Sequence, residues 1–265
     1  MIPPHPLHAE DVFLQAGGHR LRARRLVPDG EGRGPTLVFL HEALGSIPQW
    51  RDFPLRLAGT LGWPALLYDR FGHGGSGART LPLDGGHFRH EALEVLPEVL
   101  AACGVDRPVL VGHSDGGTLA LLFAARHPER TVAVLSLAAH VFVEAITLAG
   151  IRQAVTAFAA GPLRRGLERH HGAGTEALFR GWSGLWLSEA HRAWNIEGQV
   201  RVAGVPVLAL QGADDAYGSP AQVEAIAAAT GGRGLILPGC GHAPHLEAAD
   251  AVLEAALPFL RGLPP

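Results

Sequence analysis

Ser114 stands in the pattern Gly112-x-Ser114-x-Gly116, which is typical of a serine that acts as a nucleophile. An apolar run precedes this pattern and another of helical length follows it, which predicts a sharp turn between a strand and a helix. Glycine lacks a Cβ atom, so glycines on both sides of the serine relieve the crowding of such a turn. The helix would present its positive end to the serine. A serine hydroxyl is a weak nucleophile at neutral pH, so this chemistry also requires a base and an acid that orients the base.

Candidates for the acid and the base follow two later apolar runs. Asp214 and Asp215 come after one run, and His242 and His245 come after the next. Each pair would lie at the carboxyl end of a strand, on the same edge of a sheet as the serine. His245 lies beyond Pro244 at the start of a predicted helix, a position that suits capping or packing better than proton transfer. Spacing alone does not separate the neighbouring aspartates, one of which would cap amides of the loop.

Segments typical of strands and of helices alternate along most of the chain. This alternation predicts an α/β fold with a mostly parallel central sheet flanked by helices. The glycine-rich loops 41–46, 69–77 and 112–117 each follow a predicted strand, so they should meet at the carboxyl edge of the sheet, where ligands bind. The helix over 87–103 should kink at Pro97. The predicted strands are 12–15, 21–27, 36–40, 64–68, 109–111, 132–137, 205–210 and 234–237, and the predicted helices are 48–61, 87–103, 117–126, 220–229 and 246–260.

One long segment interrupts the alternation. Residues 140–203 contain several helical stretches and no strand pattern. We therefore predict a helical lid over 140–203, inserted into a core made of residues 1–139 and 204–265. Three tryptophans of this segment either pin the lid to the core or form an aromatic wall for the substrate. They are Trp182, Trp186 and Trp194.

The composition excludes several classes of protein. With 47% hydrophobic and 18% charged residues, the 265-residue chain has ample material for a core and is not generally disordered. Its net charge of −3 argues against a nucleic-acid partner. No apolar run approaches the roughly 18 residues of a membrane span. Because residues 1–5 show no signal-peptide pattern, we expect a cytoplasmic protein without a membrane partner.

Cysteine and histidine positions point away from disulfide and metal chemistry. Cys103 and Cys240 are far apart in the sequence, and both are expected to be reduced and buried. Although the chain has 15 histidines, none shows the spacing of metal ligands, so we expect neither a metal nor another cofactor. His170 and His171, in the predicted lid, are expected on the surface.

The sequence resembles the α/β-hydrolase-fold serine hydrolases that carry a helical lid. Its order of serine, aspartate and histidine along the chain is the order of that family. The resemblance implies that Ser114 is the nucleophile, that Asp215 rather than Asp214 is the orienting acid, and that His242 is the base. The matching segments are 39–42, 68–76, 112–117, 212–215 and 241–242.

The resemblance also implies which groups bind the oxyanion of the reaction. The backbone amides of Ala43 and Asp115 would donate hydrogen bonds to it. The chain departs from the family pattern after His41, because most relatives have glycine where this chain has Glu42. Glu42 either caps nearby amides or, together with Asp115, makes the pocket floor negative and discourages anionic acyl groups. His41 and His113 are expected to hold the loops by hydrogen bonds.

A serine nucleophile of this kind implies acyl transfer to water through an acyl-enzyme. Hydrolysis of carboxylic esters or lactones with small, uncharged acyl groups needs no further parts and is our leading interpretation. Relatives with aspartate at the elbow are dehalogenases and epoxide hydrolases, and Ser114 argues against both. Carbon–carbon bond hydrolysis of ring-cleavage products is an alternative, although such relatives typically carry Gly-Asn-Ser at the elbow. Peroxidation without a cofactor, thioester hydrolysis and a ligand receptor without turnover also stay open. The sequence does not decide the natural substrate or whether the chain forms a homo-oligomer.

Overall fold

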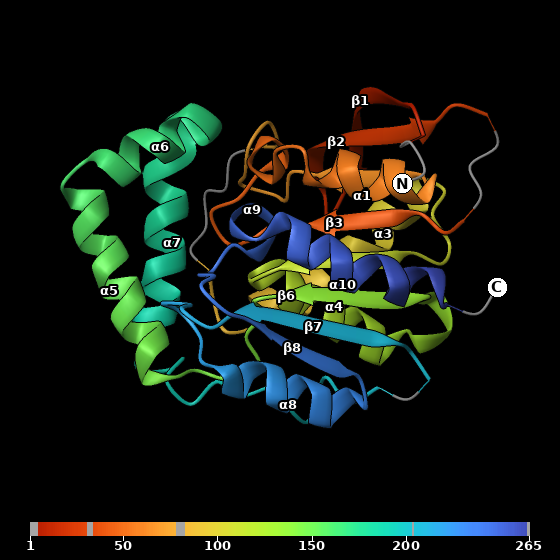
Figure 1. Cartoon of the computed structure of the whole chain (residues 1–265). Coiled ribbons are helices and arrows are strands. Elements are labelled where there is room, and N and C mark those ends of the chain that lie inside the picture. Colours follow the sequence, from red (N-terminus) through yellow and green to blue (C-terminus); the bar gives the residue numbers. More distant parts are fainter. Residues whose placement is uncertain (1–4, 31–33, 78–82, 203, 264–265) are drawn as a thin grey trace.

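A central sheet of eight strands organises the chain in the computed structural model, which describes residues 5–30, 34–77, 83–202 and 204–263. The strands lie in the order β1-β2-β4-β3-β5-β6-β7-β8 (Figure 1). Strands β3 to β8 are parallel, and β1 and β2 form an antiparallel hairpin at one edge. The strands are β1 (Leu7–Ala16), β2 (His19–Pro28), β3 (Leu37–Leu40), β4 (Ala65–Tyr68), β5 (Val109–His113), β6 (Ala133–Leu137), β7 (Val207–Gly212) and β8 (Arg233–Leu237).

The hairpin at the edge is longer than the sequence predicted. Pairing extends as far as Leu7 and Pro28, beyond the predicted strands over 12–15 and 21–27. The turn is the one expected, because Gly17 and Gly18 both adopt positive φ angles, of 57° and 72°. Backbone pairing with a neighbouring strand thus extends these strands past the residues whose pattern predicted them.

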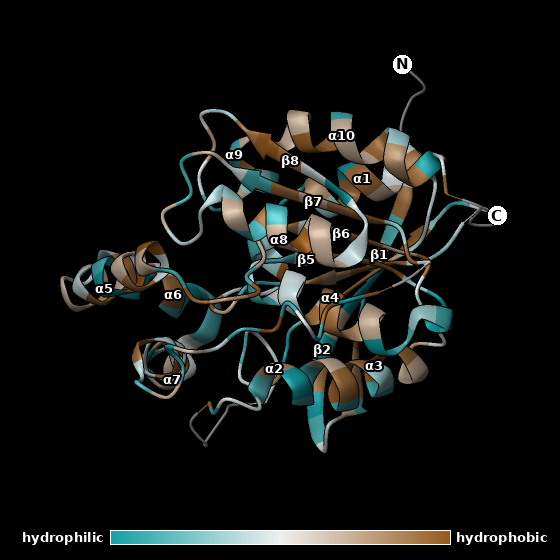
Figure 2. Ribbon diagram, turned by 90° about the horizontal axis from the view of Figure 1, so that it is seen from below, coloured by the Kyte–Doolittle hydropathy of each residue, from teal (hydrophilic) through white to brown (hydrophobic). Residues whose placement is uncertain are grey.

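Helices cover both faces of the sheet, as Figure 2 shows. They include α1 (Phe53–Leu61), α3 (Leu96–Ala102), α4 (Asp115–Arg126), α8 (Pro220–Thr230) and α10 (Ala249–Arg261). Leu57 of α1 and Leu253 of α10 belong to one buried cluster, on one face. Leu119 of α4 and Val223 of α8 belong to the other. The parallel strands are therefore buried on both sides, which explains their continuous apolar runs.

Two predicted helices differ in detail from those observed. The helix over 87–103 consists of α2 (His87–His90), a π-helical segment (Glu91–Val95) and α3. The change of helical type next to Pro97 agrees with the predicted irregularity, because proline has no amide hydrogen for the regular ladder. The predicted closing helix over 246–260 is divided, since α9 (Pro244–Glu247) ends before α10 begins.

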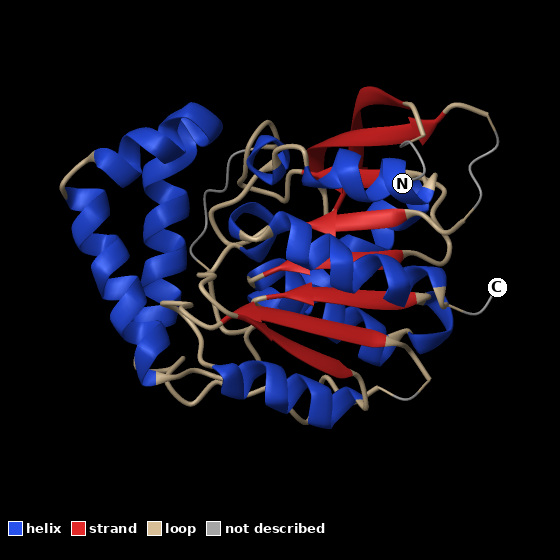
Figure 3. Cartoon of the chain, in the orientation of Figure 1, coloured by secondary structure: helices blue, strands red, loops and turns tan. Residues whose placement is uncertain are grey.

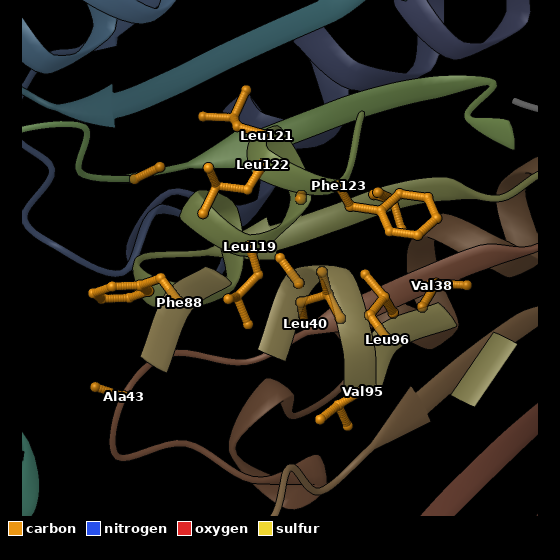
Figure 4. Close-up of a cluster of buried hydrophobic side chains, with 14 of the residues drawn as sticks. Val38, Leu40, Ala43, Phe88, Val95, Leu96, Leu119, Leu121, Leu122 and Phe123 are labelled. Carbon is orange, nitrogen blue, oxygen red and sulfur yellow. The ribbon is translucent and has the colours of Figure 1, made fainter. Parts of the chain in front are cut away.

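Close packing behind the sheet also supports the loop that follows β3. Leu40 of β3, Phe88 of α2 and Leu119 of α4 are at most 2% exposed and belong to the buried cluster drawn in Figure 4. Ala43, on the loop after β3, belongs to the same cluster. The core that positions α4 therefore also positions this loop.

Among the described residues, three α-helices lie between β6 and β7 in the sequence. They are α5 (Ala145–Ala159), α6 (Pro162–His171) and α7 (Thr175–Leu187), and they fall within the segment predicted to be helical, 140–203. They stand beyond the end of the sheet toward which the arrows of the parallel strands β3 to β8 point in Figure 3. The proposed division at 139/140 and 203/204 remains a prediction, and residues 1–4, 203 and 264–265 lie outside the described residues.

Candidate active site

Ser114 occupies a tight turn between β5 and α4. Its backbone has φ 51° and ψ −118°, a conformation that residues other than glycine rarely adopt. The turn also depends on Gly116, where an added Cβ atom would lie only 1.8 Å from the carbonyl oxygen of Leu40. The predicted glycine on each side of the serine is therefore explained by close backbone approach. Backbone strain of this kind is characteristic of functional sites.

The structure brings Ser114, His242 and Asp215 together from three loops. Ser114 Oγ lies 3.0 Å from His242 Nε2. On the other side of the ring, His242 Nδ1 lies 2.9 Å and 2.8 Å from the two carboxylate oxygens of Asp215. Asp215 is 4% exposed, whereas Asp214 faces solvent.

The surroundings of Asp215 keep it ionised. Burial by itself would raise the pKa of this carboxyl, but hydrogen bonds from His242 and from the Tyr217 amide bring it below its ordinary value. A carboxylate at this position accepts a hydrogen bond from His242 Nδ1–H and so holds the ring proton on Nδ1. The other ring nitrogen, Nε2, is then free to accept the proton of Ser114.

The other histidines near the site make structural contacts. His113 Nε2 donates to the carbonyl oxygen of His242 over 2.7 Å and so fixes the backbone of that residue. His41 Nδ1 donates to the carbonyl of Glu42 over 2.7 Å, and its Nε2 accepts from the Arg70 amide. The ring of His245 packs 4.6 Å from that of Trp50. These contacts agree with the packing and loop-holding roles that the sequence predicted.

The loop after β3 carries the second predicted oxyanion donor. Ala43 and Asp115 both line the cavity next to Ser114, and among the described residues neither amide has a hydrogen-bond partner in the protein. The peptide that carries the Ala43 amide is oriented through its carbonyl side, because Glu42 O accepts from Arg70 Nη2 over 3.0 Å. Two unpaired amides at a cavity beside a serine are the arrangement that an oxyanion requires.

Glu42 has the capping role that the sequence left open, and its effect on anionic acyl groups stays a prediction. Its Oε2 caps the Leu44 amide over 2.5 Å, and the side chain also lines the cavity. Burial raises the pKa of Glu42 above its ordinary value. Burial likewise raises the pKa of Asp115 to about 6, against the opposing charge of Arg70. The cavity floor therefore carries two carboxyl groups whose ionisation is disfavoured.

A cavity of about 570 Å³ lies over Ser114. Its outer wall comes from α5, α6 and α7, which contribute Ile151, Leu167, Trp182 and Trp186 among others. Trp194, by contrast, is absent from the described lining, so the prediction that it forms part of the pocket is wrong. Its ring packs 5.2 Å from Phe88 and 5.2 Å from His191, because the chain returns to the core after α7.

Three features of the site escaped the sequence analysis. Tyr217, whose ring lies 4.7 Å from that of His242, lines the cavity, and its place two residues after Asp215 was the available signal. His171 is only 8% exposed, so its predicted surface position is wrong. The loop 69–77 does not contribute to the described lining but supports the loop after β3 from behind, since His73 Nε2 donates to Ala43 O over 2.9 Å.

Some other groups bear on chemistry outside the serine site. The described residues contain no group of three or more His, Cys, Asp or Glu side chains placed to hold a metal ion. Cys103 and Cys240 are free thiols, and Cys240 is buried whereas Cys103 is half-buried. Within the described part of the chain, no helix is both long and apolar enough to cross a membrane.

The fold and the serine site define a class of protein. The chain belongs to the α/β hydrolase fold family, whose sequence profile matches residues 35–199. Among solved structures, the enol-lactonase from Burkholderia xenovorans LB400 is similar, with a TM-score of 0.76 and 22% identity over 94% of this chain and all of that one. Naproxen esterase from Bacillus subtilis has a TM-score of 0.73 and 17% identity over 96% of this chain and 92% of that one.

Curated relatives match a shorter part of the chain. A protein described as a non-heme haloperoxidase, from Mycobacterium phage D29, is 34% identical over 106 residues, which are 40% of this chain and 36% of that protein. Epoxide hydrolase 3 of Xenopus tropicalis is 35% identical over 103 residues, 38% of this chain and 26% of that protein. The chain thus matches only about a third of the length of these relatives.

Proposed function

We propose that this chain is a serine hydrolase that cleaves carboxylic esters or lactones through an acyl-enzyme. The observation that supports this function most directly is the linked geometry of three side chains. Ser114 Oγ lies 3.0 Å from His242 Nε2, and His242 Nδ1 lies 2.8 Å from Asp215. A hydroxyl, an imidazole and a buried carboxylate in this order form the arrangement that activates a serine for acyl transfer.

The proposed reaction has two halves. His242 Nε2 takes the Ser114 proton while Ser114 Oγ attacks the ester carbonyl, and the amides of Ala43 and Asp115 stabilise the oxyanion. His242 then gives this proton to the leaving alkoxide, which departs as the alcohol. In the second half, water loses a proton to His242 and attacks the acyl-enzyme, and Ser114 recovers its proton as the acid leaves. Asp215 keeps the imidazole oriented and stabilises its charged form throughout.

The size and the lining of the cavity favour substrates whose acyl groups are small and carry no negative charge. Its volume of about 570 Å³ lies within the usual range of sites for small ligands. Glu42 and Asp115 lie at its floor beside Ser114, where an anionic acyl group would meet their carboxyl groups. We propose that α5, α6 and α7 act as a lid, because their side chains complete the wall opposite the serine.

Hydrolysis of short p-nitrophenyl esters and of a lactone by the whole chain, with Ser114→Ala as the comparison, tests this function. We expect p-nitrophenyl acetate or butyrate to be hydrolysed, and Ser114→Ala to lose that activity together with labelling by a fluorophosphonate probe. Labelling that survives Ser114→Ala would show that another residue is the nucleophile. Turnover of a ring-cleavage dienoate without ester turnover would replace the proposal with carbon–carbon bond hydrolysis. Tight ligand binding without any turnover would favour a receptor.

A further inference from the structure

His171, at the end of α6, contacts the loop that carries Ala43. Its Nε2 lies 2.8 Å from the carbonyl oxygen of Leu44, and its Nδ1 lies 3.0 Å from the amide nitrogen of Gly74. Only 8% of the residue is exposed. A side chain of the helical insertion therefore uses both ring nitrogens to hold the backbones of two loops of the sheet.

These two contacts determine where the His171 proton resides. Because Nδ1 accepts from the Gly74 amide, the ring proton must be on Nε2, which donates to Leu44 O. Burial lowers the pKa of His171 and outweighs the hydrogen bond to Leu44, which acts in the other direction, while the neighbouring His170 lowers this pKa further. The rings of His41 and His73, which also lie near it, carry no negative charge. The imidazole is therefore a neutral donor toward the loop after β3.

The Leu44 carbonyl is part of the turn that orients the Ala43 amide. The Gly45 amide donates to Glu42 O over 3.0 Å, so Glu42 to Gly45 form a tight turn whose central residues are Ala43 and Leu44. Leu44 O and the Gly45 amide belong to one planar peptide group, and Glu42 O and the Ala43 amide belong to another, so the hydrogen bond from Gly45 to Glu42 links the two groups. A hydrogen bond that holds Leu44 O therefore restrains the peptide that presents the Ala43 amide to the cavity.

The face of α6 that carries His171 also covers the cavity. Leu163, Leu167 and His171 are spaced four residues apart, so they lie along one side of the helix. The two leucines line the cavity, while His171 reaches the loop. We propose that His171 is a positioning residue through which α6 keeps the Ala43 amide aligned for the oxyanion. This inference rests on the proposed function.

Three substitutions at one position separate the two hydrogen bonds of His171. His171→Gln keeps a donor at the distance of Nε2, and His171→Asn keeps an acceptor at the place of Nδ1, whereas His171→Leu removes both. We expect His171→Leu and His171→Asn to lower kcat for p-nitrophenyl butyrate about tenfold, with KM within threefold of wild type. His171→Gln should stay within threefold of the wild-type kcat. Arg165→Ala, an exposed position on the same helix, is the matched control and should leave both constants unchanged.

The outcomes distinguish a role of His171 in positioning the Ala43 amide from a role only in the stability of the fold. If kcat follows the thermal midpoint across the three variants, or if His171→Leu keeps the wild-type kcat, the positioning role is overturned. If the wild type hydrolyses no ester, the proposed function fails instead. In that case the rate at which a fluorophosphonate labels Ser114 replaces kcat, because its phosphoryl oxygen would use the same two amides. The same ranking of the variants is expected, and equal labelling rates would overturn the inference.

Discussion

Two neighbouring carboxylates show how strongly function depends on the contacts of single residues. Asp215 is buried against His242, while Asp214, one residue earlier, faces solvent. Asp214 lies in the turn after β7 and is exposed, whereas Asp215, the next residue, is buried, so only Asp215 reaches the imidazole. The chemical type of the two side chains is identical, and their surroundings alone assign them different roles.

Replacing each aspartate separately tests this assignment. We expect Asp215→Asn to lower kcat for p-nitrophenyl butyrate on the order of 10³-fold or more, because the amide no longer orients and stabilises the imidazole. Asp214→Asn should remain within twofold of wild type. Steady-state kinetics of the two variants provides the measurement. Equal losses in both would contradict the assignment of Asp215 as the acid.

Glu42 should control selectivity rather than the rate of the chemical step. In Glu42→Gln the side-chain oxygen can still cap the Leu44 amide, but the negative charge is gone. We expect kcat/KM for an ester with a carboxylate in its acyl group to rise about tenfold, while that for a neutral ester stays within threefold. Since burial raises the pKa of Glu42, the wild-type enzyme should discriminate more strongly as the pH rises and Glu42 ionises. Identical selectivity of variant and wild type across the pH range would remove this role.

At the level of elements, the turn before α4 limits which residues the chain can carry. A Cβ atom on Gly116 would collide with the backbone of β3, which cannot move without breaking its pairing with β5. Gly184, in the last turn of α7, has open space where a Cβ atom would be added. Of these two helical glycines, one leaves no room for a side chain and the other has room for one.

The corresponding alanine substitutions should change stability in opposite directions. We expect Gly116→Ala to lower the free energy of unfolding by about 3 kcal/mol or more, because backbone atoms would have to shift. Gly184→Ala should raise it by about 0.5–1 kcal/mol, since alanine favours the helix and restricts the unfolded chain. Urea denaturation followed by circular dichroism measures both. A neutral Gly116→Ala would show that the turn is less tightly packed than the structure indicates.

At the scale of the whole molecule, the buried imidazole of His245 makes a contribution to stability that depends on pH. Burial, together with the charge of His242, lowers the pKa of His245 to about 3. Between about pH 6.5 and this value, the unfolded chain binds a proton at this residue and the folded protein does not. The contribution of His245 to the stability of the fold therefore decreases as the pH falls through this interval.

Replacing His245 with phenylalanine should weaken this acid sensitivity. The ring lies among those of Trp50, Phe53 and His113, so an aromatic side chain can occupy the same place. We expect His245→Phe to lose less stability than wild type on acidification from pH 6 to pH 4, by about 1.4 kcal/mol for each pH unit. Urea unfolding curves at several pH values provide the test. Parallel pH profiles of the two proteins would rule out His245 as a source of the acid sensitivity.

The sequence by itself determined the elements and the order of the chemical groups. Apolar periodicity and glycine positions predicted the strands, the turn at Ser114 and the helical insertion, because such patterns reflect interactions between near neighbours in the chain. The choice of Asp215 as the acid that orients His242 came from the family resemblance, since spacing left the two aspartates equivalent.

Only the tertiary structure decided which side chains face the cavity. His171 looked like a surface residue in a polar helix but is buried, and Trp194 turns away from the cavity to pack against Phe88. The direction in which α6 and the segment after α7 dock on the sheet sets both outcomes. That direction arises from packing between residues far apart in the sequence, and no local pattern records it.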